Sequence, residues 1–429
     1  MTLVLVVLFG LMLLGIPVAF AILSAGMAYL ATTGGSMLVV AQRLIYGLNS
    51  FTLLAVPLFI LVGNLMDFGG ISKRLTDWAK SILGWLPGGL GIVTVFSCAI
   101  FAALTGSGPA TVAAIGSIML PSMLKAGYSR ETSAGLVASA GALGPIIPPS
   151  IPMIIYGVTM NLSIPAMFMA GVVPGLVIAL ALSLVNVVFA YRNPEVLKHA
   201  KTMKFDFKES MKLFWKALGA LGLPVLILGG IYGGIFTPTE SAAVGIVYAL
   251  ILGFALKELK VKDLPKILIN SLKTSTMVNF IIAAVSLFSW VVSKSQIGIV
   301  ISNAFISFVG GSQALYLFVL VVVLLIVGCL MDNVAATLIL APILIPVGIA
   351  LGCNELHIGM LFCICLVVGF VTPPFGYNLF TAVSISGLNF KQIVKGALPF
   401  LLTEILLLFV FAYVPGIITW LPRLMGYGY

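Results

Sequence analysis

Oxygen-bearing side chains gather at two short interruptions inside apolar stretches of this sequence. They are Thr105, Ser107 and Thr111 at the first interruption, and Asp332, Asn333 and Thr337 at the second. Hydroxyl, amide and carboxylate oxygens are the ligands that hard cations prefer. The pattern therefore indicates cation binding, with Na⁺ as the expected ion.

The composition defines the medium in which these residues act. Hydrophobic residues make up 61% of the 429 residues and charged residues only 8%, with a mean hydropathy of +1.22. A soluble domain is about 25% charged, so this composition excludes a cytosolic enzyme, a disordered protein and a nucleic-acid binder. Since roughly 20 apolar residues span a bilayer, the length allows about ten to twelve crossings. The net charge of +10 is then typical of positively charged cytoplasmic loops.

Asp332 is the single carboxylate at the centre of a long apolar run. A charge at membrane depth is costly, so such a residue is by default a functional one. A Na⁺ ligand, a substrate contact and a structural hydrogen-bond acceptor are all open roles for it. The alternative is that Asp332 has no functional role and is a carboxylate at a water-exposed turn.

Two further apolar segments are interrupted by proline pairs, Pro148-Pro149 and Pro373-Pro374, with Ser150, Thr372 and Asn378 beside them. Proline blocks the helix, and unpaired backbone at membrane depth persists only where it is buried in protein or lines a cavity. Each break supplies half-helix carbonyl ends suited to Na⁺ and amide ends suited to an anion. A simple kink would explain one proline, but not four breaks in matching positions.

The two halves of the chain are related by one ungapped shift of 225 residues. It relates Pro148 to Pro373, Pro121 to Pro346, Gly171 to Gly396 and Pro174 to Pro399. The same shift aligns the first interruption with the second in the sequence. One register through several prolines and glycines indicates an internal duplication.

Flanking charge predicts the orientation of each half. Basic residues stand on both sides of the run 90–124, namely Lys73, Arg74, Lys80, Lys125 and Arg130. Both ends of that run are therefore cytoplasmic, and the run is a re-entrant hairpin with its turn at residues 105–109. The matching run 313–350 has poorly charged flanks, so it enters from the opposite side. This is the inverted-repeat plan of secondary transporters.

The resulting division of the chain has three parts. Residues 1–191 are the first repeat, with the hairpin 90–124 and a broken helix 131–160. Residues 192–217 are a basic amphipathic connector on the cytoplasmic side. Residues 218–429 are the second repeat, with the hairpin 313–350 and a broken helix 357–386.

Five motifs resemble a known family. They are Gly-Ile-Pro-Val-Ala-Phe at 15–20, Pro-Leu-Phe at 57–59, Thr-Gly-Ser-Gly-Pro-Ala-Thr at 105–111, Gly-Pro-Ile-Ile-Pro-Pro-Ser at 144–150 and Gly-Ile-Phe-Thr-Pro-Thr-Glu at 234–240. In this order, over essentially the whole chain, they resemble the large membrane subunit of tripartite ATP-independent periplasmic (TRAP) transporters. The sialic-acid branch looks most similar.

The resemblance implies an all-α polytopic fold of the inverted-repeat ion-transporter type that works as an elevator in the bacterial inner membrane. It implies Na⁺-driven import of an organic acid, with sialic acid expected before C4-dicarboxylates. The implied partners are a periplasmic substrate-binding protein and a small four-helix membrane subunit. Because Met1 opens directly into the large subunit, we expect the small subunit to be a separate chain.

The polar residues at the breaks and the family resemblance together predict the site. The expected substrate contacts are Ser107, Gly108, Thr111, Ser150, Asp332 and Asn378. One Na⁺ is expected at Thr105, Ser107, Gly144 and Pro148, and another at Asp332, Asn333, Thr337, Thr372 and Pro373. No organic cofactor is expected.

Other classes of function have less support. An intramembrane enzyme would need a cluster such as His-Glu-x-x-His or paired aspartates, and the chain has only two histidines. A stand-alone Na⁺/dicarboxylate symporter of related inverted-repeat design is the alternative. Co-purification of a small membrane subunit would separate it from the TRAP interpretation.

Overall fold

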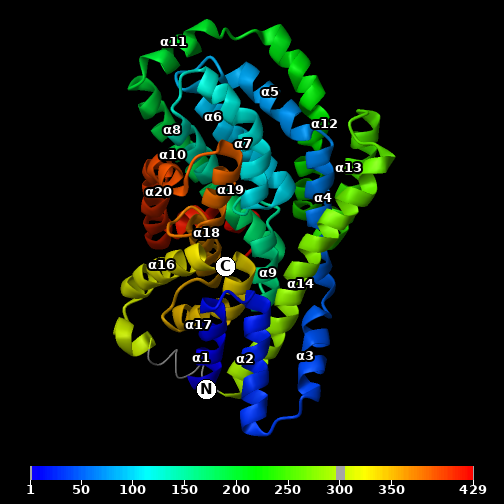
Figure 1. Cartoon of the computed structure of the whole chain (residues 1–429), viewed down its shortest axis with the longest axis vertical. Coiled ribbons are helices and arrows are strands. Elements are labelled where there is room, and N and C mark those ends of the chain that lie inside the picture. The colour runs from blue at the N-terminus through cyan, green and yellow to red at the C-terminus, as the bar shows by residue number, and fades with distance from the viewer. Residues whose placement is uncertain (1, 296–304, 429) are drawn as a thin grey trace.

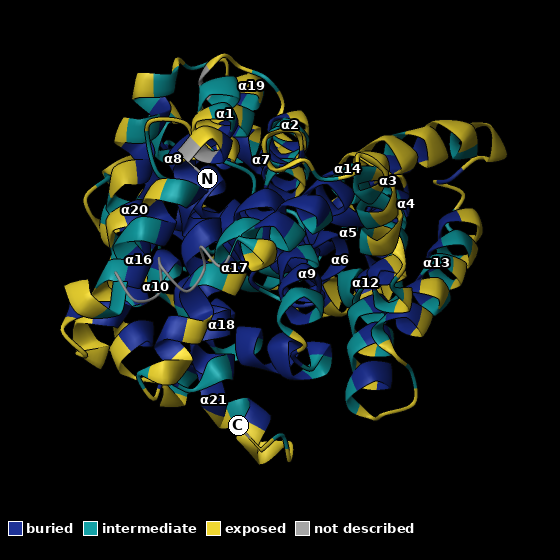
Figure 2. Ribbon diagram, turned by 90° about the horizontal axis from the view of Figure 1, so that it is seen from below, coloured by how far each residue is buried: buried dark blue, intermediate teal, exposed yellow. Residues whose placement is uncertain are grey.

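The computed structural model describes residues 2–295 and 305–428, and within these residues it contains helices and no strands. Eight of the described helical segments are long and apolar enough to cross a membrane. Exposed leucines of α10 (Ile164–Tyr191) show the expected lipid-facing surface: Leu176, Leu180 and Leu184 recur at one-turn spacing and are 58–63% exposed. Figure 2 shows the buried residues at the centre and the exposed ones on the peripheral helices. The predicted all-α polytopic fold is confirmed.

The first part of the chain forms a peripheral group of helices and then the first hairpin. The peripheral helices are α1 (Thr2–Leu13), α2 (Val18–Thr33), α3 (Leu38–Leu48), η1 (Phe51–Leu54), α4 (Ala55–Phe68) and α5 (Ile71–Leu83). The first hairpin consists of α6 (Gly89–Thr105) and α7 (Gly108–Lys125), and after it come α8 (Arg130–Ala140), η2 (Gly141–Leu143), α9 (Ile151–Met160) and α10.

The second part repeats this order. Its peripheral helices are α11 (Pro194–Thr202), α12 (Phe207–Tyr232), α13 (Pro238–Ala255), η3 (Val261–Asp263) and α14 (Leu264–Lys294). The second hairpin consists of α16 (Gln313–Leu330) and α17 (Asn333–Ala350), and after it come α18 (Glu355–Gly369), α19 (Tyr377–Ser386), α20 (Phe390–Tyr413) and α21 (Gly416–Leu424).

Both predicted hairpins and both predicted broken helices are present. The pairs α6–α7 and α16–α17 each turn through two residues, Gly106-Ser107 and Met331-Asp332. Residues 144–150 separate η2 from α9, and residues 370–376 separate α18 from α19. These two non-helical segments carry the proline pairs, and both Pro-Pro bonds are cis.

The helix bounds agree with the 225-residue shift. It carries the bounds of α7 onto those of α17, and the first residue of α8 onto that of α18. In Figure 1 the first hairpin (cyan) lies in the upper half of the molecule and the second (yellow) in the lower half. The three-part division of the chain stays a prediction. In the structure α12 runs without a break through residue 217, so the end of the expected connector and the helix after it are continuous.

Two groups of helices pack side by side. Helices α2, α3 and α4 contact α14, and α4 also contacts α13; we call these five helices the scaffold. The hairpins and broken helices, α6–α9 and α16–α19, contact one another and form what we call the central unit. Within it α7 contacts α19 and α9 contacts α17, so each hairpin packs against the broken helix of the other half.

Glycine allows two helices from different halves to meet at backbone distance. A Cβ atom added to Gly396 of α20 would overlap the backbone of Glu131 in α8, and one added to Gly135 would overlap the backbone of Gly396. Backbone cannot move aside as a side-chain end can. Small residues allow this kind of close approach between membrane helices.

We therefore expect Gly396→Ala to destabilise the protein, by about 1–3 kcal/mol as for other overpacked sites. Gly229→Ala is the matched control, because Gly229 lies within α12 and nothing is within 4 Å of its added Cβ. That control should be neutral or slightly stabilising, since alanine favours a helix over glycine. Thermal melting of both purified variants in detergent would check this, and equal melting temperatures would contradict the close α8–α20 contact.

Candidate functional site

The first hairpin tip is closed by its own hydroxyl groups. Thr105 ends α6, Gly106 comes next with φ +59°, and Ser107 directly precedes α7 without a capping hydrogen bond from its side chain. The Thr111 hydroxyl donates to the Ser107 carbonyl oxygen at 2.8 Å and lies 3.2 Å from the Thr105 hydroxyl. The structure therefore brings the three expected oxygen-bearing residues of this interruption together.

The tip packs directly on the first proline-containing segment. A Cβ atom added to Gly144 would lie 2.6 Å from the Ser107 carbonyl oxygen, and one added to Gly106 would lie 2.8 Å from the Pro149 carbonyl oxygen. Glycine is needed at both positions, because any side chain would push the turn away from the segment. Ser107 and Gly144, two of the four residues expected at the first Na⁺ site, are thus in contact.

Asn378 lies at the first hairpin although it belongs to the second half. From the first turn of α19 its side-chain amide donates to the Ala138 carbonyl oxygen at 3.1 Å. A Cβ atom added to Gly108 would lie 2.7 Å from the Asn378 Oδ1 atom. Asn378 is fully buried, and its Oδ1 has no hydrogen-bond partner among the described residues. The expected substrate contacts Gly108 and Asn378 therefore meet across the two halves.

The second hairpin tip carries buried polar atoms that lack partners. The Asp332 carboxylate accepts a hydrogen bond from the backbone N–H of Val334 at 2.8 Å and caps α17. Asn333 and Thr337 are one turn apart and 2% and 0% exposed. No hydrogen bond to the Asn333 amide or the Thr337 hydroxyl is made by any described residue. Since buried polar groups are normally bonded, these oxygens suit a hard cation.

Other expected residues have local hydrogen bonds. The Ser150 hydroxyl donates to the Pro145 carbonyl oxygen at 2.5 Å and caps α9. The Thr372 hydroxyl donates to the Val368 carbonyl oxygen at 3.1 Å. Where the second proline-containing segment meets its hairpin, the Gly376 N–H donates to the Cys329 carbonyl oxygen at 3.4 Å.

A cavity of about 170 Å³ separates the first hairpin tip from the scaffold. Its polar lining consists of Thr105 and Ser107 of the hairpin, Asn64 and Asp67 of α4 and Thr274 of α14. Helix α4 comes this close because Gly63 lies against the backbone of Thr105. The three scaffold residues, Asn64, Asp67 and Thr274, were not predicted from the sequence as part of the site. The available signal was the spacing of Asn64 and Asp67, which places both on one face of an otherwise apolar helix.

Comparisons with known proteins show which family the chain belongs to. The family model of the tripartite ATP-independent periplasmic transporter, DctM component, matches residues 5–417. The C4-dicarboxylate TRAP transporter large permease protein DctM of Pseudomonas aeruginosa is 39% identical over 405 residues, 94% of each chain. The sialic acid TRAP transporter large permease protein SiaM of Vibrio cholerae is 34% identical over 422 residues, 98% of each chain.

A further relative is longer than this chain. The isethionate TRAP transporter permease protein DctMQ of Oleidesulfovibrio alaskensis is 39% identical over 411 residues, which are 95% of this chain and 64% of that protein. Among solved structures, the YdaH transporter of Alcanivorax borkumensis, described as having an unusual topology, matches with a TM-score of 0.60 at 14% identity. That match covers 91% of this chain and 89% of the other, and it shows a shared fold. The chain is therefore a DctM-type large permease subunit of the TRAP transporter family, a multi-pass protein of the bacterial inner membrane.

Proposed function

We propose that this subunit couples the inward movement of Na⁺ to the import of an organic acid. The observation that carries the proposal is the second hairpin tip, where the buried oxygens of Asn333 and Thr337 have no hydrogen-bond partner among the described residues and Asp332 precedes them in the chain. Na⁺ is compact and takes oxygen ligands, and helix breaks at membrane depth supply them. Titratable groups, which a proton-driven mechanism would use, are scarce in the chain.

Two or more Na⁺ ions are proposed, one at each hairpin. The first site uses Thr105, Ser107, Gly144 and Pro148, and the second uses Asp332, Asn333, Thr337, Thr372 and Pro373. Bound cations would order the hairpin tips and leave half-helix amide ends free to hold an anion between them. The residues proposed to contact that anion are Ser107, Gly108, Thr111, Ser150, Asp332 and Asn378.

The substrate class is supported by the names of the relatives. C4-dicarboxylates, sialic acid and isethionate are all organic anions. Sialic acid remains one candidate. The chain is 39% identical to the C4-dicarboxylate protein and 34% identical to the sialic-acid protein, which supports a C4-dicarboxylate as the second candidate substrate.

The family also indicates the partners. A tripartite system with a periplasmic component implies a substrate-binding protein and a small membrane subunit beside the large one. We propose that the small subunit is a separate four-helix chain. A stand-alone Na⁺/dicarboxylate symporter would need neither partner, so dependence of uptake on the binding protein distinguishes the two.

An elevator mechanism fits the packing. The central unit would move against the scaffold, and the cavity of about 170 Å³ at the first hairpin tip lies on the boundary between them. The Na⁺ gradient supplies the work, aided by about 2.3 kcal/mol per net charge per 100 mV of membrane potential.

The first functional prediction concerns the coupling ion. Proteoliposomes that hold both membrane subunits should accumulate a candidate acid when Na⁺ and binding protein are outside. Accumulation should stop when K⁺ replaces Na⁺ on both sides, and a proton gradient alone should not restore it. Equal uptake in K⁺ would refute Na⁺ coupling.

The second prediction concerns Asp332. The Asp332→Asn variant keeps an acceptor oxygen for the Val334 N–H, so it should fold and insert. It loses the charge, and charge-assisted contacts are roughly twice as strong as neutral ones, so we expect Na⁺-dependent uptake to fall at least about tenfold.

Asp206→Asn is its matched control, because Asp206 also caps a helix, α12, but at the basic end of the molecule. Uptake and melting temperature should be measured together at matched expression. Wild-type uptake by Asp332→Asn would remove Asp332 from the site.

The third prediction concerns motion. A single cysteine at Ser107, with the five native cysteines replaced, should change its reactivity toward membrane-impermeant thiol reagents when Na⁺ and binding protein are added. The reason is that an elevator exposes the hairpin tip to different sides in different states. Labelling that no ligand changes would indicate a fixed, channel-like lining.

A further inference from the structure

A second and larger cavity, of about 480 Å³ and lined by both polar and apolar residues, lies between the scaffold and the central unit. On the scaffold side it is lined by Arg43 of α3 and by Ser286, Ser289 and Trp290 of α14. On the other side it is lined by Thr159 of α9 and Leu338 of α17.

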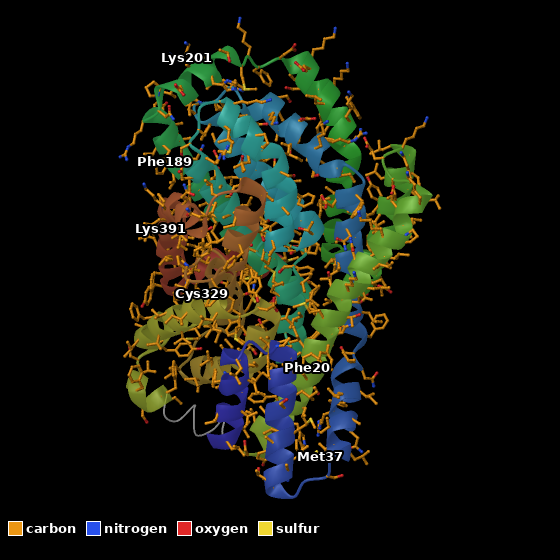
Figure 3. All side chains as sticks on the ribbon, in the orientation of Figure 1. Phe20, Met37, Phe189, Lys201, Cys329 and Lys391 are labelled. Atoms are coloured by element: carbon orange, nitrogen blue, oxygen red, sulfur yellow. The ribbon has the colours of Figure 1, made fainter. Side chains whose placement is uncertain are left out.

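This cavity belongs to the end of the molecule opposite the basic connector. In Figure 1 α3 is at the bottom and α11 at the top, and Figure 3 shows Met37 and Lys201 at these two ends. Arg43 is six residues beyond Met37 in the chain. Since the basic loops are cytoplasmic, Arg43 is a positive charge on the side where positive charge is not favoured.

Two aromatic rings hold the Arg43 guanidinium. Its Cζ atom is 5.6 Å from the ring centroid of Tyr46 and 5.5 Å from that of Trp290. Within residues 2–295 and 305–428 the one ion pair joins Arg74 to Glu258, so no described carboxylate neutralises Arg43. A ring over the guanidinium face leaves the N–H donors in its plane available to an anion.

We infer that this cavity binds the acidic group of the substrate before it reaches the hairpins, an inference that rests on the proposed function. A guanidinium can hold a carboxylate or a sulfonate through two hydrogen bonds, and the serine hydroxyls suit the remaining polar groups of such an acid. A cavity of about 480 Å³ is of the size that small ligands occupy. Leu338 belongs to α17, the helix that also carries Asn333 and Thr337 of the proposed second Na⁺ site.

The charge of the cavity can be measured without any substrate. Ser289→Cys, with the native cysteines replaced, is modified with a negatively and with a positively charged methanethiosulfonate reagent of similar size. Arg43→Gln should lower the ratio of the anionic to the cationic rate by about tenfold, and Arg43→Lys should largely keep it. Lys273→Gln is the control, because Lys273 is an exposed charge on the same helix but sixteen residues from Ser289 and outside the lining, and it should leave the ratio nearly unchanged.

A ratio that Arg43→Gln does not change would overturn the inference, because Arg43 would then act elsewhere, for example on lipid headgroups.

Uptake provides the second measurement. Arg43→Gln should raise the KM of the transported acid about tenfold while kcat changes little, since the contact is made before the central site. An unchanged KM would also overturn the inference.

Protection completes the test. The transported acid should slow the modification of Ser289→Cys when Arg43 is present, and should no longer slow it when Arg43→Gln is added. If the acid gives no protection in the protein that keeps Arg43, the inference is wrong. If no acid were transported at all, the proposed function would fail, while the reagent ratio would still report whether the cavity attracts anions.

Discussion

A helix interrupted at membrane depth leaves backbone carbonyl and amide groups that must find partners inside the protein. This chain brings four such interruptions into one central unit. Side chains close each of them: Thr111 donates to the Ser107 carbonyl, Ser150 to that of Pro145 and Thr372 to that of Val368, while Asp332 accepts from the Val334 N–H. The side chains that stabilise the breaks are thus the ones proposed to bind ions and substrate, so the same few oxygens serve the fold and the function.

Close backbone packing is the second requirement, and it joins the two halves. Gly144 allows the first proline-containing segment to reach Ser107, and Gly396 allows α20 to reach the backbone of α8. Each hairpin packs against the broken helix of the other half and also against the proline-containing segment of its own half, so both halves contact each hairpin. A movement of one hairpin tip would therefore shift a segment of the opposite half, because the two are closely packed.

Much of this fold could be predicted from the sequence, because prolines, glycines and isolated polar residues mark breaks in apolar runs. The bounds 90–124 and 313–350 lie within a few residues of the helix pairs observed. Asn378 was expected at the substrate site, but its contacts with Ala138 and Gly108 were not predictable, since a repeat relates corresponding residues of the two halves and does not say how the halves pack together. Asn64 and Asp67 were missed for a similar reason: they serve the first tip from a helix distant in sequence. The choice among acids depends on side-chain shape at the site, which no local pattern encodes.

The boundary between scaffold and central unit holds two cavities of unlike charge. One contains Arg43, and the other, beside the first hairpin tip, contains Asp67. Arg43 would attract an anion to the first cavity and an ionised Asp67 would repel it from the second, and a cation would experience the reverse. Such an arrangement cannot alter the final accumulation ratio, which the ion gradients fix by thermodynamics. If the subunit imports an organic acid as proposed, the arrangement would act instead on the kinetics, because uptake and back-flux would saturate at different acid concentrations.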